Sequence, residues 1–245
     1  METAVAIIPA RYGSTRLPGK ALIDIEGKPL IRRVYERVSE ASLVSRVVVA
    51  TDDPRIARAI ISFGGEAVMT SPEHKSGTDR VAEAAAITGG DIIVNVQGDE
   101  PLIDPLVIDR VIEKIREDAG IDCSTAASPV TDEAVYRDPN AVKVALDLRG
   151  RALYFSRSPL PFYRDGVFGG AYLHAGIYCF RREFLAIFTT LEPTPLEQAE
   201  KLEQLRMLEH GYSIGVVITG HVSIGVDTPE DLEKVRRKIR MKSEG

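Results

Sequence analysis

The chain has 245 residues, of which 44% are hydrophobic and 27% are charged, and its formal net charge is −5. This size and composition are typical of a globular protein with a substantial core, and the acidic balance excludes a general nucleic-acid-binding protein, because no excess of cations is available for a phosphate backbone. No apolar run is as long as a membrane span, no secretory leader pattern opens the sequence, and Cys123 and Cys179 form neither a metal-binding nor a disulfide pattern, so we expect a cytoplasmic protein that does not insert into membranes.

The first predicted element is a buried strand over residues 5–8, which leads into a basic turn. Glycines, a hydroxyl group and three cations give this turn the donors and the positive charge that a polyphosphate requires. Five residues separate Gly13 from Gly19, and Ala21 follows the lysine, so the turn is neither a Walker loop nor a dinucleotide-binding loop. A solvated basic turn without a ligand is the alternative interpretation. The candidate phosphate-binding residues are Arg11, Ser14, Arg16 and Lys20.

Strands and helices then alternate through the first half of the chain. The strands are predicted over residues 47–50, 66–69 and 92–96, and the helices over residues 30–38, 55–63, 80–87 and 105–117. Continuous apolar strands that alternate with helices predict an α/β fold, with a mainly parallel mixed sheet flanked by helices. Ligands of such sheets bind at the carboxyl ends of the strands.

The second half of the chain is less regular. The predicted strands cover residues 124–130, 142–147, 173–180 and 214–218, and the predicted helices cover residues 181–188, 195–209 and 229–241. A stretch rich in proline, glycine and aromatic residues, 159–170, predicts a mobile loop. We find no linker or internal repeat, so we expect a single domain over residues 1–245.

Two aspartates each follow a predicted strand and precede a helix. Asp99 lies beside Gly98 after the strand 92–96, and Asp227 follows Val226 near the last helix. Carboxylates at this edge of a sheet can hold Mg²⁺, which usually takes one or two carboxylates together with phosphate oxygens. Turn formation or helix capping is the alternative for each. Thr228 already supplies the cap of the last helix, which leaves Asp227 for another role.

A hydroxyl-rich turn precedes the predicted helix 80–87. Its backbone and side chains could read the edge of a base, and an ordinary helix cap is the alternative. The residues concerned are Ser76, Gly77, Thr78 and Arg80.

The second half of the chain carries a set of polar side chains without an obvious structural role. Arg157 and Arg164 could hold a carboxylate, and Glu203 and Gln204 could bind sugar hydroxyls, although a wet helix surface explains the last pair as well. His174 could equally be a satisfied structural histidine. His74, His210 and His221 are expected to be surface residues.

Six segments together resemble one family, the 3-deoxy-manno-octulosonate cytidylyltransferases, or CMP-Kdo synthetases. They lie in one order between about residues 5 and 235, and the combination is far more specific than the first turn alone. The segments read IIPARYGSTRLPGKAL, VNVQGDEPLID, YFSRSPLPF, HAGIYCF, KLEQLRMLE and GVDTPEDL.

This resemblance implies a fold of the nucleotide-diphospho-sugar transferase type, usually a homodimer, with a smaller sugar-binding and dimerisation region within about residues 122–212. It implies transfer of CMP from CTP to the anomeric hydroxyl of Kdo, with release of pyrophosphate, for lipopolysaccharide synthesis. Arg11, Ser14, Arg16 and Lys20 would then bind the triphosphate, Ser76, Gly77, Thr78 and Arg80 would lie near the cytosine, and Asp99 and Asp227 would hold Mg²⁺. The sugar site would contain Gln97, Arg157, Arg164, His174, Tyr178, Glu203 and Gln204.

Two alternatives remain open from the sequence. One is a cytidylyltransferase for another acid sugar, such as 8-amino-Kdo or a sialic acid, because only residues of the second half separate these enzymes. The other is a nucleotide-binding regulator without catalysis, although the joint presence of Lys20, Asp99 and Asp227 argues against it.

Overall fold

The computed structural model describes residues 2–13, 17–220 and 224–243, which form two compact units. The first unit holds the described residues up to Asp109 together with the C-terminal segment 224–243. The second unit holds residues 110–220 and therefore includes the region 122–212, for which the sequence predicts sugar binding.

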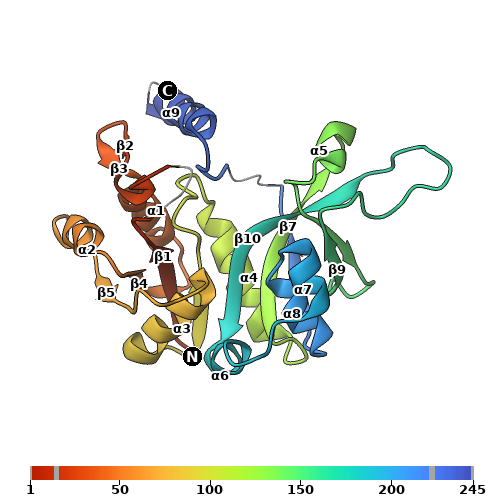
Figure 1. Cartoon of the computed structure of the whole chain (residues 1–245), viewed down its shortest axis with the longest axis horizontal. Coiled ribbons are helices and arrows are strands. Elements are labelled where there is room, and N and C mark those ends of the chain that lie inside the picture. Colours follow the sequence, from red (N-terminus) through yellow and green to blue (C-terminus); the bar gives the residue numbers. More distant parts are fainter. Residues whose placement is uncertain (1, 14–16, 221–223, 244–245) are drawn as a thin grey trace. The chain divides into compact units, whose positions relative to one another are not determined.

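Four parallel strands form the sheet of the first unit, in the order β6-β1-β4-β5 (Figure 1). They are β1 (Ala4–Ala10), β4 (Val44–Thr51), β5 (Ala67–Met69) and β6 (Ile92–Asn95). Six of the seven residues of β1 are buried, because helices cover both faces of a parallel sheet. The strands predicted in this half of the chain are confirmed.

Side-chain caps mark the starts of two helices of the first unit. α2 (Pro54–Ile61) starts after Asp53, whose side chain accepts from the backbone of Arg55, and α3 (Gly77–Thr88) starts with a capping box between Ser76 and Asp79. The other helices are α1 (Leu30–Ser39), α4 (Pro105–Glu117), which continues into the second unit, and α9 (Pro229–Ser243).

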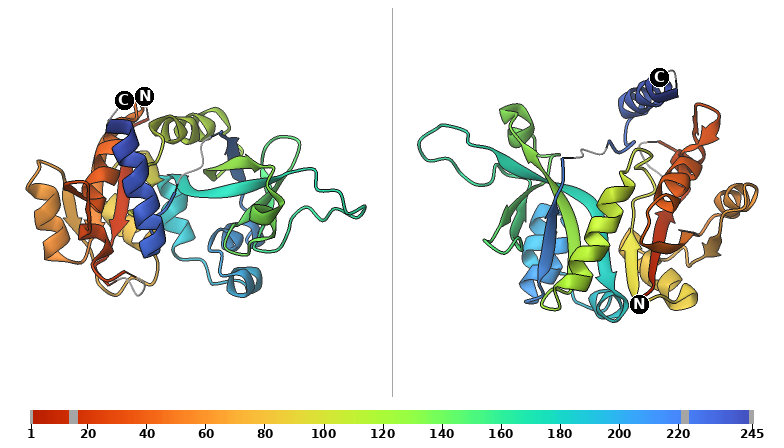
Figure 2. Two further views of the ribbon diagram at one scale, coloured as in Figure 1. Left: turned by 90° about the horizontal axis from the view of Figure 1, so that it is seen from above. Right: turned by 180° about the vertical axis from the view of Figure 1, so that it is seen from behind.

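Short elements that the sequence did not predict join these helices to the sheet. They are the 3-10 helix η1 (Lys20–Leu22) and a hairpin of β2 (Asp24–Ile25) and β3 (Lys28–Pro29). The C-terminal helix α9 lies beside this hairpin, as both views of Figure 2 show, and Arg236 donates to the backbone oxygen of Asp24 at 2.8 Å.

The second unit has a mixed sheet. Its strands are β7 (Cys123–Val130), β8 (Lys143–Leu146), β9 (Ala152–Ser156), β10 (Ala171–Arg181) and β11 (Ile214–Ile218). β7 pairs with β11 in parallel and with β10 antiparallel, and β8 pairs antiparallel with β9 and β10. The predicted mainly parallel but mixed sheet is confirmed.

The prediction was wrong for one helix of the second unit and missed two elements. The expected helix 195–209 is two helices, α7 (Pro195–Glu200) and α8 (Gln204–Glu209), because Lys201 adopts a left-handed conformation with φ 54°. Strand β9 and the short helix α5 (Glu133–Arg137) were not predicted, whereas α6 (Arg182–Phe188) was. None of the described helices has the length and apolar character that a bilayer crossing requires.

Candidate functional site

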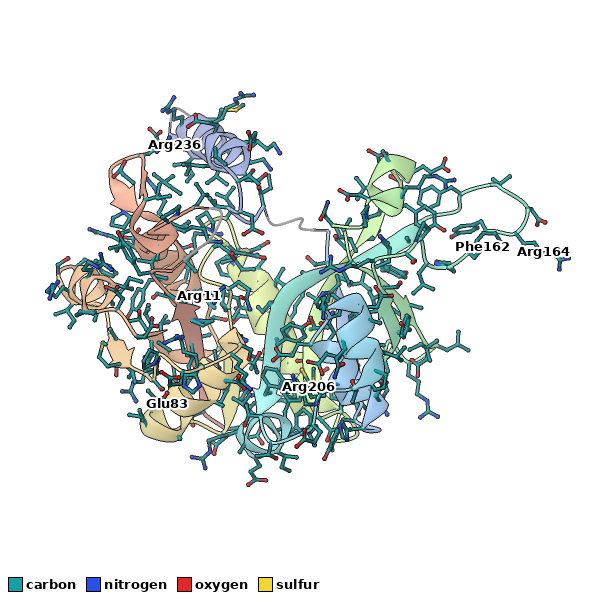
Figure 3. All side chains as sticks on the ribbon, viewed as in Figure 1. Arg11, Glu83, Phe162, Arg164, Arg206 and Arg236 are labelled. Atoms are coloured by element: carbon teal, nitrogen blue, oxygen red, sulfur yellow. The ribbon has the colours of Figure 1, made fainter. Side chains whose placement is uncertain are left out.

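A cavity of about 310 Å³ lies in the first unit, at the carboxyl ends of its strands, and is the main candidate site. It brings together predicted residues that are far apart in the sequence. Those in its lining are Arg11, Lys20, Ser76, Gly77, Arg80, Gln97, Asp99 and Asp227. Figure 3 shows Arg11 within this unit. Ser14 and Arg16, also predicted to bind phosphate, lie outside the described residues.

Lys20 joins the two predicted metal-binding carboxylates. Its Nζ donates to Asp99 Oδ2 at 2.7 Å and to Asp227 Oδ1 at 3.0 Å. Burial by itself lowers the pKa of Lys20, but the charges and hydrogen bonds of Asp99 and Asp227 outweigh this effect, so the pKa lies above its usual value. Lys20 therefore stays charged throughout the neutral range.

The turn before Lys20 is held by a glycine and an aromatic ring. Gly19 has φ 68°, and a Cβ at this position would lie 3.1 Å from the ring of Tyr12. The backbone NH of Gly19 donates to the oxygen of Tyr12 at 3.1 Å, and the guanidinium carbon of Arg55 lies 3.4 Å from the centre of the same ring. These contacts fix the position of the backbone from which the Lys20 side chain enters the cavity.

The C-terminal segment supplies the second carboxylate. The backbone NH of Val226 donates to the oxygen of Asp99 at 2.8 Å, which holds Asp227 next to the end of the sheet. Thr228 Oγ1 accepts from the backbone NH of Asp231 at 3.2 Å and so caps α9, as the sequence predicts, while Asp227 faces Lys20.

The residues at this point fit a magnesium ion. Asp99 and Asp227 supply hard carboxylate oxygens that converge on one cation, and both line a cavity with further cationic side chains for phosphates. The described residues contain no set of three or more histidine, cysteine or acidic side chains placed to hold a metal. Two carboxylates completed by substrate phosphates are the usual arrangement for Mg²⁺.

The loop before α3 forms another part of the lining. Ser76 Oγ accepts from the backbone NH of Asp79 at 3.1 Å, so its hydroxyl caps the helix, which was the alternative interpretation. Thr78 is buried and is not in the cavity lining. Arg80 is almost fully buried, donates to Thr70 Oγ1 at 2.5 Å and lies 3.3 Å from Asp52 Oδ2, which fixes its direction.

His74 and Lys75 were missed as site residues. His74 was expected on the surface, but it lines the cavity and its Nε2 pairs with Glu83 of α3. This hydrogen bond is the main reason that the pKa of Glu83 lies below its usual value. The only sequence signal was the position of both residues immediately before the predicted base-binding turn.

The second unit contains most of the predicted acid-sugar residues. His174 and Tyr178 are on β10, with ring centres 5.4 Å apart. Burial lowers the pKa of His174 to about 3, so its ring is neutral at pH 7. Burial also raises the pKa of Tyr178, and the charges of Cys123 and Glu203 add to this effect. Glu203 is the N-cap residue of α8. Gln204 is buried at the start of α8.

The two predicted arginines differ in their surroundings. Arg157 donates through Nε to the backbone oxygen of Glu200 at 2.8 Å and through Nη1 to that of Pro139 at 3.0 Å. Arg164 is exposed at the outer end of the loop 157–170, well apart from Arg206 of α8 in Figure 3. The structure thus holds Arg157 in a fixed direction and does not bring Arg164 to the helix that carries Gln204.

Comparison with known proteins identifies the family of the chain. The family model "Cytidylyltransferase" matches residues 5–214. The 3-deoxy-manno-octulosonate cytidylyltransferases of Geobacter sulfurreducens and Geotalea uraniireducens are both 55% identical to this chain, over 96% of it and 98% of each relative.

Solved structures give the same result. A CMP:2-keto-3-deoxy-manno-octonic acid synthetase complexed with CTP superimposes with a TM-score of 0.94 and 44% identity, over 98% of this chain and 99% of that one. A cytidylyltransferase from Leptospira borgpetersenii, 20% identical with a TM-score of 0.67 over 98% of this chain and 88% of that one, shares the fold. The chain therefore belongs to the 3-deoxy-manno-octulosonate cytidylyltransferase family and has the predicted nucleotide-diphospho-sugar transferase fold.

Proposed function

We propose that this protein is a nucleotidyltransferase that transfers CMP from CTP to the anomeric hydroxyl of Kdo and releases pyrophosphate, for lipopolysaccharide synthesis. The observation that carries the proposal is the cavity in which Lys20 joins Asp99 and Asp227, in a chain 55% identical to enzymes of that name. Both cysteines are free thiols, as in a reducing compartment, and we place the reaction in the cytoplasm.

The cations of the first unit act on the triphosphate. Arg11, Lys20 and Lys75 line the cavity and supply positive charge for phosphate oxygens, and we assign Ser14 and Arg16 to the same group from the sequence. During the displacement, negative charge builds up on the departing pyrophosphate, and fixed cations stabilise it without reorganisation. Arg80 and the turn beside it face the base.

The carboxylates Asp99 and Asp227 would hold Mg²⁺. When bound, this ion would neutralise charge at the α-phosphate and polarise the attacking hydroxyl. Lys20 keeps the two carboxylates together and oriented through its two hydrogen bonds. Since the acceptor hydroxyl attacks phosphorus directly, no protein nucleophile is required, and positioning and electrostatics account for catalysis.

The acceptor sugar is bound mainly by the second unit. Arg157 is the cation for its carboxylate, and the neutral His174 and protonated Tyr178 act as hydrogen-bonding groups toward hydroxyls. Glu203 and Gln204 complete this set, and Arg164 reaches it only if the loop 157–170 rearranges.

We also propose a homodimer formed through the second unit. Phe162 is 83% exposed and Val167 is 74% exposed on the loop 157–170, and Leu153 is 62% exposed on β9. Exposed apolar side chains of this size favour burial against another surface. Light scattering on the purified protein should give twice the chain mass, and Phe162→Ser should lower it, whereas a monomeric wild-type protein would contradict the proposal.

One assay tests the function. The purified protein is incubated with CTP, Mg²⁺ and an acid sugar, and pyrophosphate is measured. Release with Kdo supports the proposal. Release only with 8-amino-Kdo or a sialic acid would assign a different acceptor, and calorimetric binding of CTP without release from any sugar would favour a non-catalytic regulator.

Substitution of Asp99 tests the metal assignment. Asp99→Ala should lower turnover by about a thousandfold, equivalent to ~4 kcal/mol of barrier, because the charge at the α-phosphate loses its counterion. Glu233→Ala, which removes a surface carboxylate of α9, is the matched control and should leave turnover unchanged. Turnover of Asp99→Ala within tenfold of wild type would overturn the assignment.

A further inference from the structure

Thr125 of β7 is fully buried, and its hydroxyl touches three polar groups of β10. Its Oγ1 lies 2.6 Å from the oxygen of Ile177, 3.2 Å from that of Ala175 and 3.0 Å from Nε2 of His174. The pairing of β7 with β10 shifts between Ala175 and Tyr178, and this irregularity turns both backbone oxygens toward Thr125. The proposed function gives Thr125 no role.

The three contacts decide which nitrogen of His174 carries a proton. A threonine hydroxyl has one hydrogen to donate, and a backbone oxygen can only accept. The Thr125 hydroxyl therefore donates its hydrogen to a carbonyl oxygen, and that of Ile177 is the nearer at 2.6 Å. Toward His174 the hydroxyl can only accept, so the donor of that contact is Nε2–H.

A neutral imidazole with its proton on Nε2 has a lone pair on Nδ1. The ring is neutral because burial lowers the pKa of His174 to about 3. The ring is also fixed in place, since Phe155 packs edge-on at 4.9 Å and Tyr178 lies at 5.4 Å between ring centres. Nδ1 is then a hydrogen-bond acceptor of set direction.

We propose that Thr125 is a positioning residue that holds His174 in the Nε2–H tautomer, so that Nδ1 accepts a hydrogen bond from one hydroxyl group of the acceptor sugar. This inference rests on the proposed function. An ionised carboxylate has no hydrogen to donate, so His174 in this state selects a hydroxyl and leaves the sugar carboxylate to a cation. The tautomer thus contributes to the choice of acceptor.

The tautomer can be read without any activity. Protein labelled with ¹⁵N in its histidine rings should show, for His174, a pyrrole-type Nε2 and a pyridine-type Nδ1 in long-range ¹H–¹⁵N spectra. Four histidines are present, and His174→Gln identifies the signals. A pyrrole-type Nδ1 at His174 in the wild-type protein would overturn the inference.

Two substitutions of Thr125 separate the hydroxyl from packing. Thr125→Val keeps the shape but removes the hydroxyl, so the His174 signals should become those of exchanging tautomers and KM for Kdo should rise about threefold to tenfold, with KM for CTP unchanged. Thr125→Ser keeps the hydroxyl and should restore both the spectrum and the KM for Kdo. Equal kinetic losses in the two variants would mean a packing role and would overturn the inference.

Addition of Kdo separates this inference from the proposed function. If Kdo supports pyrophosphate release and shifts the Nδ1 signal of His174, both stand. If release is normal but neither nitrogen of His174 responds to Kdo, the sugar-facing role is wrong and the function stands. If no pyrophosphate is released with Kdo, the function and the sugar contact both fail, while the tautomer is still decided by the wild-type spectrum.

Discussion

Lys20 is the residue that links the two carboxylates of the candidate cavity. It donates to both carboxylates of the site, and the backbone before it is set by Gly19, whose φ of 68° and close contact with Tyr12 disfavour a side chain. The charge of Lys20 and the shape of its turn can be tested separately.

Removal of the Lys20 charge should expose the repulsion between Asp99 and Asp227. Lys20→Met should lower the melting temperature without metal by about 2–4 °C, the shift that ~1 kcal/mol produces in a domain of this size. Added Mg²⁺ should raise the melting temperature of Lys20→Met more than that of the wild type, because it replaces the lost cation. Equal Mg²⁺ shifts in thermal unfolding scans would contradict the proposed metal site.

Substitution of Gly19 tests the turn. Gly19→Ala and Gly27→Ala both force a side chain into a left-handed conformation, at about 1–2 kcal/mol each. Only Gly19 has the Tyr12 ring at 3.1 Å from the added Cβ, whereas nothing lies within 4 Å at Gly27. We expect KM for CTP to rise about tenfold in Gly19→Ala and less than twofold in Gly27→Ala, measured by initial rates. Similar values in both variants would show that the Tyr12 contact is unimportant.

Single residues also show what the sequence could reveal. Asp99 was predictable because it comes soon after strand β6, and ligands of parallel sheets bind at the carboxyl ends of the strands. Asp227 was also expected to follow a strand, but β11 ends at Ile218 and residues 224–227 are irregular. His74 was not predictable, since its role depends on a loop that folds back to Glu83. The role that we propose for Thr125 could not be predicted for a similar reason. The contacts of its hydroxyl depend on the irregular pairing of β7 with β10.

At the scale of elements, β8 and β9 are tied together by a buried lysine. Lys143 is 1% exposed, and its Nζ donates to the backbone oxygens of Asp138 at 2.8 Å, Ala141 at 2.5 Å and Arg157 at 2.6 Å. Burial lowers its pKa. These bonds hold the segment after α5 against the end of β9, where Arg157 begins its own bonds to Glu200. The sequence predicted β8 but missed β9, whose five residues mix buried and exposed positions.

Lys143→Met should therefore destabilise the protein. Three backbone oxygens lose their donor, and unsatisfied buried groups cost about 1–3 kcal/mol each, partly offset by removal of a buried charge. We expect a loss of about 3 kcal/mol in the free energy of unfolding, measured with urea. Lys234→Met, whose side chain is 61% exposed, should change it by less than about 0.5 kcal/mol. A loss of unfolding free energy no larger than that of Lys234→Met would contradict the stabilising role of Lys143.

At the scale of the whole molecule, the predicted residues divide between the two units by ligand. The cavity lining comes entirely from the first unit, and the predicted acid-sugar residues other than Gln97 come from the second. The alternation of strands and helices predicted the first unit well. The second unit was less predictable, because left-handed Lys201 and the pairing of β8 with two strands have no periodic signature.

This division predicts that CTP binding does not depend on the acid-sugar residues of the second unit. Tyr178→Phe should raise KM for Kdo about fivefold, through one lost hydrogen bond, and leave the Kd for CTP within twofold of wild type. Arg11→Ala, which removes a cation from the cavity, should weaken CTP binding by about tenfold or more. Isothermal titration calorimetry with CTP and no sugar measures the CTP affinity of both variants, and initial rates give the KM for Kdo. An equal loss of CTP affinity in the two variants would refute the division.

The first unit is discontinuous, and this has a consequence for the order in which the protein is made. The strands of its sheet lie before Asp109 in the sequence. Asp227 lies in the C-terminal segment, next to Val226, whose backbone NH donates to the backbone oxygen of Asp99. Once the chain has been made as far as Thr219, all the strands among the described residues are present, but only one of the two carboxylates that we propose to hold Mg²⁺. The proposed metal site is therefore complete only once residue 227 has been made.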